Sequence, residues 1–196
     1  MDALDTSPDD LEAVRQTLVA ELRRHALVIG TVMLTSGAVA EYYVDAKRAI
    51  LRPAGFAALA TLVAAQVEEW GATAVGGMTM GADPVACAAL AGGVDAKAFF
   101  VRKDAKAHGL QRRVEGPMLD SADRCVVVED VVTTGGSTLA AIAALQDEGR
   151  VICGVISVLD RLAGGGAAIE AAAGAPYRAL STIDEVHPDR PDRPGP

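Results

Sequence analysis

The sequence predicts an α/β fold in which helices flank a mostly parallel central sheet. Two strand-to-helix units carry this prediction: a short apolar run at 74–76 and a β-branched run at 126–132, each followed by a small-residue loop and an alanine-rich helix. A third apolar run, 151–159, ends in a charged pair. The composition agrees, because 51% of the 196 residues are hydrophobic and 20 are glycine.

Length and composition also limit the domain organisation and the classes of function. We expect one domain over residues 1–185, with a small hood formed mainly by about residues 1–50, and a disordered, proline-rich tail over 186–196. The net charge of -8 argues against general nucleic-acid binding. No apolar run approaches the roughly 20 residues that span a bilayer, and the acidic N-terminus does not resemble a signal peptide.

The cysteines favour a reducing compartment. Cys87, Cys125 and Cys153 are odd in number, widely spaced and set in apolar surroundings, so we expect reduced core thiols. A disulfide or a cysteine-bound metal is not expected, and the predicted location is the cytoplasm.

The N-terminal quarter predicts a helix followed by a hairpin. Ser7 is a suitable N-cap and Pro8 a suitable first helical residue, with apolar residues at helical spacing as far as His25. Between 31 and 47, two extended segments flank Ser36-Gly37. Tyr42 and Tyr43 lie in the second segment, and taken alone such a pair of aromatic residues favours a place in the core.

The next part of the chain predicts a helix over 53–70, with Gly71 as its C-cap, and then the first strand of the main sheet at 74–76. A small-residue loop over 77–82 leads to a helix that begins at Asp83-Pro84, and a strand is expected at 97–101. A basic segment, 102–113, follows that strand. Charge runs are usually solvated loops, but this one is long and glycine-containing, which is typical of a lid over an active site.

The central stretch, 126–138, predicts a grip for a sugar phosphate. Its loop, from Thr133 to Ser137, can direct backbone N–H groups and hydroxyls at an anion near a helix N-terminus, and Gly135 and Gly136 allow close approach. The adjacent Glu129 and Asp130 are suited to accept hydrogen bonds from the vicinal hydroxyls of a ribose. The alternatives are a plain buried strand with a tight turn, or the magnesium-holding strand of a P-loop ATPase; the latter needs a G-x-x-x-x-G-K-[ST] partner, which the sequence lacks.

The C-terminal part supplies one more candidate. After the helix over 138–148 and its stop at Gly149, the strand at 151–159 leads to Asp160-Arg161. An arginine at the carboxyl end of a strand is a natural partner for a carboxylate, although a salt bridge with its neighbour is an equal alternative. A glycine-rich connection over 164–166, a short helix over 167–173 and an edge strand over 177–183 complete the chain.

Three motifs together resemble those of orotate phosphoribosyltransferases, within the type I phosphoribosyltransferases. Residues 126–138 resemble the signature for phosphoribosyl pyrophosphate (PRPP), Ser36-Gly37 with 42–45 resembles the segment over the base, and 102–109 resembles the basic lid. The resemblance implies the type I fold and transfer of the 5-phosphoribosyl group from PRPP to orotate, giving orotidine 5-monophosphate and pyrophosphate in pyrimidine synthesis.

The resemblance also implies roles for individual residues. The implied catalytic residues are Lys103, Lys106, His108 and Asp130. PRPP would contact these residues together with Arg102, Glu129, Val131, Val132, Thr133, Thr134, Gly135, Gly136 and Ser137. Orotate would contact Thr133, Arg161, Tyr42 and Tyr43. Mg2+ would be held through PRPP, and a homodimer would share lid residues between subunits.

Two positions depart from the family pattern, and two other functions compete. Thr35 and Met80 stand where many relatives carry a lysine. A phosphoribosyltransferase for another base is the nearest alternative, and the lid cations with Arg161 favour a carboxylated base over it. The second alternative is a non-catalytic PRPP-sensing regulator, which would ordinarily need a DNA-binding segment.

Overall fold

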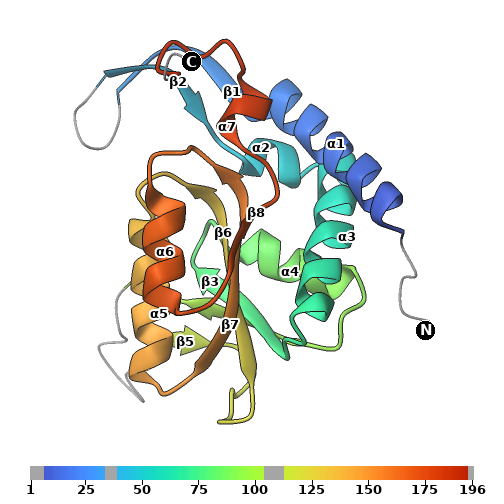
Figure 1. The fold of residues 1–196 in the computed structure, drawn as a ribbon, viewed down its shortest axis with the longest axis vertical. Helices are drawn as coiled ribbons and strands as arrows, with labels where there is room; N and C mark the ends of the chain where they lie inside the picture. The colour runs from blue at the N-terminus through green and yellow to red at the C-terminus, as the bar shows by residue number, and fades with distance from the viewer. Residues whose placement is uncertain (1–6, 34–38, 104–112, 194–196) are drawn as a thin grey trace.

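The larger of two β-sheets organises the molecule (Figure 1). A computed structural model describes residues 7–33, 39–103 and 113–193. The six strands of this sheet follow the order β5-β4-β3-β6-β7-β8, and all pair in parallel except β5, which is antiparallel to β4. Strands β1 and β2 form a separate antiparallel pair. The predicted α/β class with a mostly parallel sheet is confirmed.

The strands are β1 (Leu27–Met33), β2 (Val39–Val44), β3 (Ala74–Met78), β4 (Lys97–Val101), β5 (Val114–Glu115), β6 (Arg124–Val132), β7 (Val151–Asp160) and β8 (Tyr177–Ala179). The helices are α1 (Pro8–His25), α2 (Lys47–Ile50), α3 (Pro53–Glu69), α4 (Asp83–Ala91), α5 (Gly136–Asp147), α6 (Gly165–Ala173) and α7 (Ile183–Val186). Ser7 caps α1 as predicted, because its hydroxyl accepts a hydrogen bond from the Asp10 N–H.

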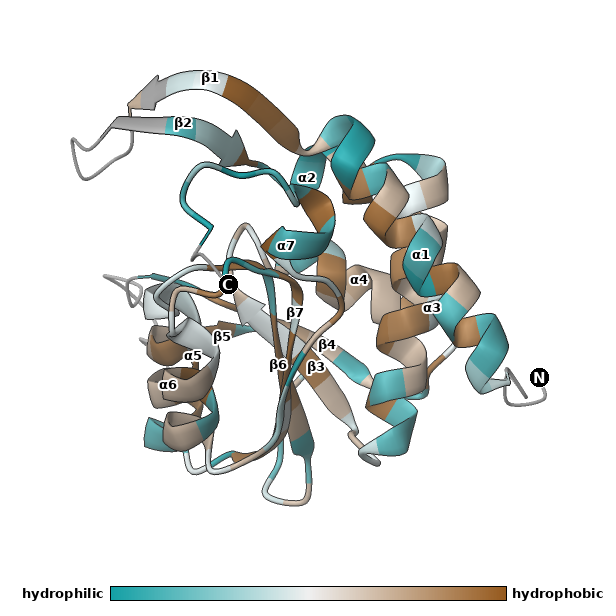
Figure 2. Cartoon of the chain, turned by 45° about the horizontal axis from the view of Figure 1, so that its top comes forward, coloured by the Kyte–Doolittle hydropathy of each residue, from teal (hydrophilic) through white to brown (hydrophobic). Residues whose placement is uncertain are grey.

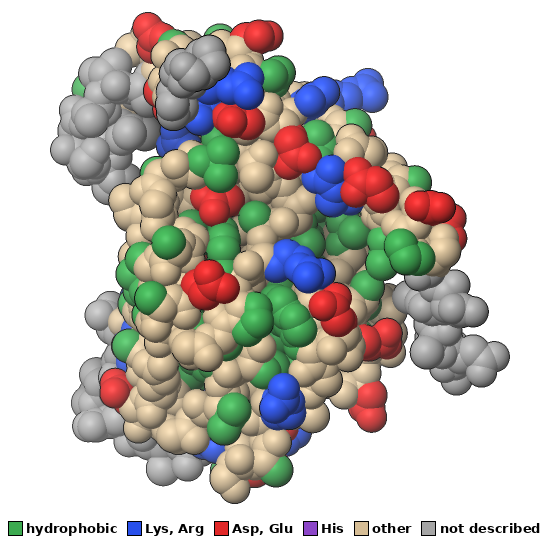
Figure 3. Space-filling view, in the orientation of Figure 1, with side chains coloured by type: hydrophobic (Ala, Val, Ile, Leu, Met, Phe, Trp, Pro, Cys, Tyr) green, Lys and Arg blue, Asp and Glu red, His purple; other side chains and the backbone are tan. Residues whose placement is uncertain are grey.

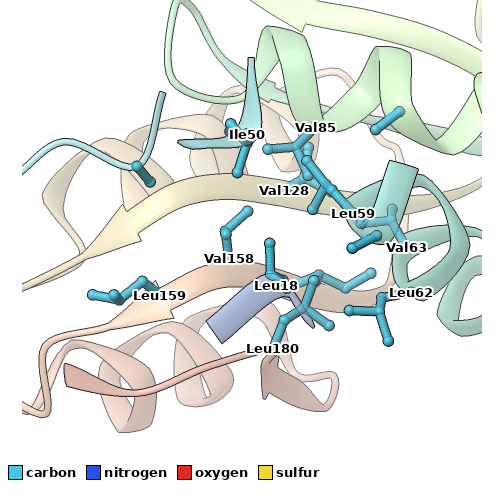
Figure 4. Packing of buried hydrophobic residues seen from close by; sticks show 14 of the residues in the cluster. Leu18, Ile50, Leu59, Leu62, Val63, Val85, Val128, Val158, Leu159 and Leu180 are labelled. Atoms are coloured by element: carbon cyan, nitrogen blue, oxygen red, sulfur yellow. The ribbon is translucent and has the colours of Figure 1, made fainter. Parts of the chain in front are cut away.

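Helices cover both faces of the larger sheet, with α5 and α6 on one side and α3 and α4 on the other (Figure 1). Strand β6 is buried on both faces, as its continuous valine run requires. Val126 and Val128 pack in the cluster that contains residues of α1, α3 and α4, and Val127 packs in the cluster that contains residues of α5. Figure 4 shows the first cluster, and Figure 2 shows hydrophobic colour both on the central strands and on helices such as α3.

Two of the boundaries that differ from the sequence prediction have steric and capping reasons. Strand β3 continues through Met78, and its glycines at 76 and 77 allow close approach, since an added Cβ would lie 2.0 Å from the Phe99 carbonyl oxygen and 2.1 Å from that of Val128. The expected edge strand over 177–183 stops at Ala179. Thr182 and Glu185 form a capping box that begins α7 instead.

Two further expectations, for the C-terminal tail and for the cysteines, differ from the structure. The tail was expected to be disordered over 186–196, but residues 187–193 pack against the hood, where Arg190 is only 7% exposed and donates hydrogen bonds to Asp184 and Asp192. Cys87 is exposed rather than in the core, whereas Cys125 is buried and Cys153 half-buried; none of the three is in a disulfide.

No helix in the described parts of the chain is long and apolar enough to cross a membrane.

Candidate active site

The carboxyl ends of four parallel strands bring the candidate residues to one edge of the sheet. The acids and the small-residue loop end β6, the loop 79–82 follows β3, Arg102 and Lys103 follow β4, and Arg161 follows β7. Ligands of open α/β sheets bind at this edge. Strands β1 and β2, which belong to the hood, lie beyond the same edge (Figure 1).

Glu129 and Asp130 are buried side by side at the end of β6, where they are 5% and 8% exposed. One Glu129 oxygen accepts a hydrogen bond from the Thr138 hydroxyl at 3.3 Å, and the other accepts from the Asp130 N–H at 3.2 Å. Asp130 accepts from the Val131 N–H at 2.9 Å. These bonds fix both carboxylates beside the loop, as recognition of neighbouring hydroxyl groups requires.

The two acids differ in charge. Burial, with the nearby charge of Asp130, raises the pKa of Glu129 to about 8. Asp130 instead forms an ion pair with Lys47, whose Nζ lies 2.7 Å from Oδ2. At neutral pH Glu129 therefore keeps its proton and can donate or accept a hydrogen bond, while Asp130 is paired with the Lys47 ammonium.

The raised pKa predicts that stability falls as the pH increases. Glu129 holds a proton up to about pH 8 in the folded protein, but only up to its ordinary 4.5 when unfolded. The folded state therefore binds more protons across that window, and the stabilisation present below pH 4.5 is lost as the pH rises to about 8. Without ligands, we expect the free energy of unfolding in urea to fall by several kcal/mol between about pH 5 and pH 8. Glu129→Gln should flatten this dependence, and an equal slope in both proteins would contradict the assignment.

The loop after the acids forms a small polar cradle. A cavity of about 160 Å3 is lined by Glu129, Val131 and residues 133–138. Gly135 adopts a φ of 81° at the start of α5, a conformation that glycine adopts without strain. Val132 lies just outside, with its side chain buried in the core, so only its backbone is available to a ligand. The cradle has the size and the donors for a phosphate group.

Lys47 is a site residue that the sequence reasoning missed. It begins α2 in the hood, and its Nζ lies 3.2 Å from Asp45 Oδ1 as well as 2.7 Å from Asp130. Burial alone would lower the pKa of Lys47, but hydrogen bonds to Asp130 and Asp45 raise it well above the usual range. The only available signal was its place two positions after Asp45, which ends the segment 42–45.

The loop after β3 packs directly against the acids. A Cβ added at Gly81 would lie 2.4 Å from Asp130 Oδ1 and 2.6 Å from Glu129 Oε1, so glycine is required for this approach. Thr79, in the same loop, lines a hollow of about 400 Å3 together with Phe100, Arg102, Lys103 and Glu115. Arg102 and Lys103 are both exposed. Lys106 and His108, and with them most of the predicted lid, lie outside the described residues.

The candidate base contacts are brought together only in part. Arg161 donates a hydrogen bond from Nη2 to the Tyr42 hydroxyl at 3.1 Å, and its guanidinium carbon lies 5.1 Å from the centre of the Tyr42 ring. Asp160 instead accepts hydrogen bonds from the Leu162 N–H and the Tyr177 hydroxyl. Tyr42 is buried and Tyr43 is 40% exposed, because neighbouring residues of β2 point to opposite faces.

Comparison with known proteins agrees with this geometry. The chain is 44% identical to the orotate phosphoribosyltransferase of Corynebacterium glutamicum strain ATCC 13032 over 182 residues, which cover 92% of this chain and 98% of that relative. It is 47% identical to that of Mycobacterium avium strain 104 over 170 residues, covering 86% and 94%. No family model matches the chain.

A solved structure of the orotate phosphoribosyltransferase of Mycobacterium tuberculosis H37Rv, in complex with PRPP, superimposes with a TM-score of 0.75. The two sequences are 38% identical, and the match covers 88% of this chain and 98% of that one. A complex of the same enzyme with Fe(III) dicitrate gives a TM-score of 0.80 at 43% identity, covering 89% and 99%.

Proposed function

Because the chain belongs to the orotate phosphoribosyltransferase family, it transfers the 5-phosphoribosyl group from PRPP to orotate, and we propose which residues perform each part of that reaction. The observation that carries the proposal is the phosphate-sized cradle of residues 133–138 directly beside two buried acids. In the proposal the cradle binds the 5-phosphate, and Glu129 and Asp130 bind the ribose hydroxyls.

The lid and the loop after β3 bind the pyrophosphate in this proposal. Negative charge builds on pyrophosphate as it departs, so fixed cations and N–H groups lower the barrier. Arg102 and Lys103, in the hollow shared with Thr79, support this assignment, and Lys106 and His108 join them by family resemblance. Orotate lies between Arg161 and the hood, where the guanidinium pairs with the base carboxylate; Thr133, Tyr42 and Tyr43 are the further contacts proposed for it.

We place Mg2+ on the oxygens of PRPP. Among residues 7–33, 39–103 and 113–193, no group of three or more His, Cys, Asp or Glu side chains is placed to hold a metal ion. Mg2+ usually keeps several water ligands and binds through substrate phosphates, so PRPP and water would hold the ion here. When bound, Mg2+ supplies further neutralisation of the pyrophosphate charge. We also propose a cytoplasmic homodimer in which the lid reaches the neighbouring subunit.

We assign Lys47 a role in PRPP binding. The described part of the loop 79–82 carries no cation, and Lys47 is the amine that contacts Asp130. Lys47→Met keeps the length of the side chain but removes its charge, so Asp130 loses its ion pair. We expect KM for PRPP to rise about tenfold. Arg48→Met, at the exposed neighbouring position, is the control, and equal KM values in the two variants would contradict the role.

The direct test of the function is an assay with several bases. Purified protein is mixed with PRPP, Mg2+ and orotate, and loss of orotate is followed by ultraviolet absorbance, with adenine, hypoxanthine and uracil in parallel. Magnesium-dependent loss of orotate alone is expected. Consumption of a purine would favour the alternative base, and PRPP binding with no consumption would favour the sensor.

A further inference from the structure

Tyr42 links the candidate base contact to the C-terminal segment of the described chain. Its hydroxyl donates to the Asp192 carboxylate, whose oxygens lie 3.0 and 3.1 Å away, and accepts from Arg161 Nη2 at 3.1 Å. The His187 ring meets the Tyr42 ring edge-on, with centroids 5.1 Å apart. Residues from the hood, from the end of β7 and from the segment after α7 therefore meet at one side chain.

Arg190 fixes the far end of this link. Its side chain is 5% exposed and lies between two carboxylates, with Nε 2.9 Å from Asp184 and Nη1 2.9 Å from Asp192. A buried guanidinium needs such partners, so the segment is anchored by more than chain connectivity. The Asp192 side chain is 54% exposed; partial burial opposes its ionisation, but hydrogen bonds from Arg190 and Tyr42 lower its pKa below the usual value.

An ionised Asp192 determines the direction of the Tyr42 hydroxyl. A carboxylate can only accept, so the single phenolic proton is directed to Asp192 and a lone pair is left for Arg161. Tyr42 thus holds Arg161 through two contacts: this hydrogen bond to its hydroxyl, and the face of its ring. Among the described residues, this is the hydrogen bond found for the Arg161 side chain, so its remaining N–H groups can pair with a carboxylate.

We infer that Tyr42, Arg190 and Asp192 are positioning residues that orient the Arg161 guanidinium for the carboxylate of the base. The inference rests on the proposed pairing of Arg161 with orotate. A bidentate pair needs two parallel N–H bonds from a planar group, so an arginine that is already oriented loses less conformational freedom on binding. The C-terminal segment thereby contributes to base recognition through Arg161.

A double-mutant cycle in the full-length enzyme tests the inference. Asp192→Ala and Tyr42→Phe are each expected to raise KM for orotate about three- to tenfold, with KM for PRPP unchanged. The orotate KM of the double variant should be no higher than that of the more impaired single variant, because both substitutions break the same link. Asp189→Ala, at an exposed position of the same segment, is the matched control and should keep the wild-type KM.

Either of two results would overturn the inference: an unchanged orotate KM in Asp192→Ala, or additive effects, which would mean that Tyr42 acts independently of Asp192. Arg161→Ala separates the premise from the inference. If the wild-type enzyme consumes orotate and Arg161→Ala keeps its KM, the pairing of Arg161 with the base is overturned and the inference fails with it. A wild-type protein that leaves orotate untouched would overturn the proposed function itself.

Discussion

Lys103→Ala is expected to lower kcat about a hundredfold or more, since a fixed cation that meets the charge developing on pyrophosphate acts mainly in the transition state. Lys103 is exposed directly after β4 and lines the hollow that also contains Thr79. Its removal should leave the core intact, so the melting temperature should stay close to that of the wild type. Steady-state kinetics at saturating orotate and PRPP, with a thermal melt of each protein, make the measurement.

Two companion variants interpret this result. Lys103→Arg keeps the charge and should retain part of the lost activity, because a guanidinium differs from an ammonium in shape. Arg24→Ala removes an exposed cation from α1 and should behave as the wild type. Near-normal turnover in Lys103→Ala would remove Lys103 from the catalytic residues.

Asp130→Ala is expected to lower kcat/KM for PRPP roughly 10- to 100-fold, which corresponds to the loss of one charged hydrogen bond to a hydroxyl and of the ordered lysine beside it. Asp130 is 8% exposed and bonded to Lys47, so the substitution also leaves that ammonium without its main partner. Initial rates at varied PRPP and saturating orotate measure the effect. Asp147→Ala, at the exposed end of α5, is the matched control.

Unchanged PRPP kinetics in Asp130→Ala would show that the acid is only structural. The two impaired variants together also test the shared lid. If the lid reaches the neighbouring subunit, mixing Lys103→Ala and Asp130→Ala subunits should restore about a quarter of the wild-type activity, because half of randomly mixed dimers are heterodimers with one complete site each. Mixtures as inactive as their components would contradict the exchange.

Local sequence predicted the sheet and its cradle well. The valines of β6, the glycines of the loop and the helix that follows are all set by neighbours in the chain, so pattern and turn chemistry suffice. The helix beginning at Ser7-Pro8 was equally local. The predicted ends of elements were wrong where contacts with a distant strand set them. Strand β3, for example, includes Gly76 and Gly77, which pack closely against Phe99 and Val128.

Long-range polar contacts could not be predicted from a single sequence. Lys47 contacts Asp130 across 83 positions, and Tyr42 contacts Asp192 across 150. Neither pair leaves a periodic signal, and a charged proline-rich segment such as 187–193 has the composition of a disordered tail. The segment is ordered because Arg190 is buried between two carboxylates, and amino-acid composition cannot predict such a contact.

The meeting of Tyr42 with Asp192 also bears on biosynthesis. A ribosome makes the hood first, then the strand and cradle of residues 126–138, and the partner of the Tyr42 hydroxyl some fifty positions later. The phosphate cradle and its acids therefore emerge before the base subsite can close. On the residue roles proposed above, a nascent chain halted between these points would hold the residues that bind PRPP but would lack the carboxylate that orients Tyr42, so the capacity to select the base would be acquired last.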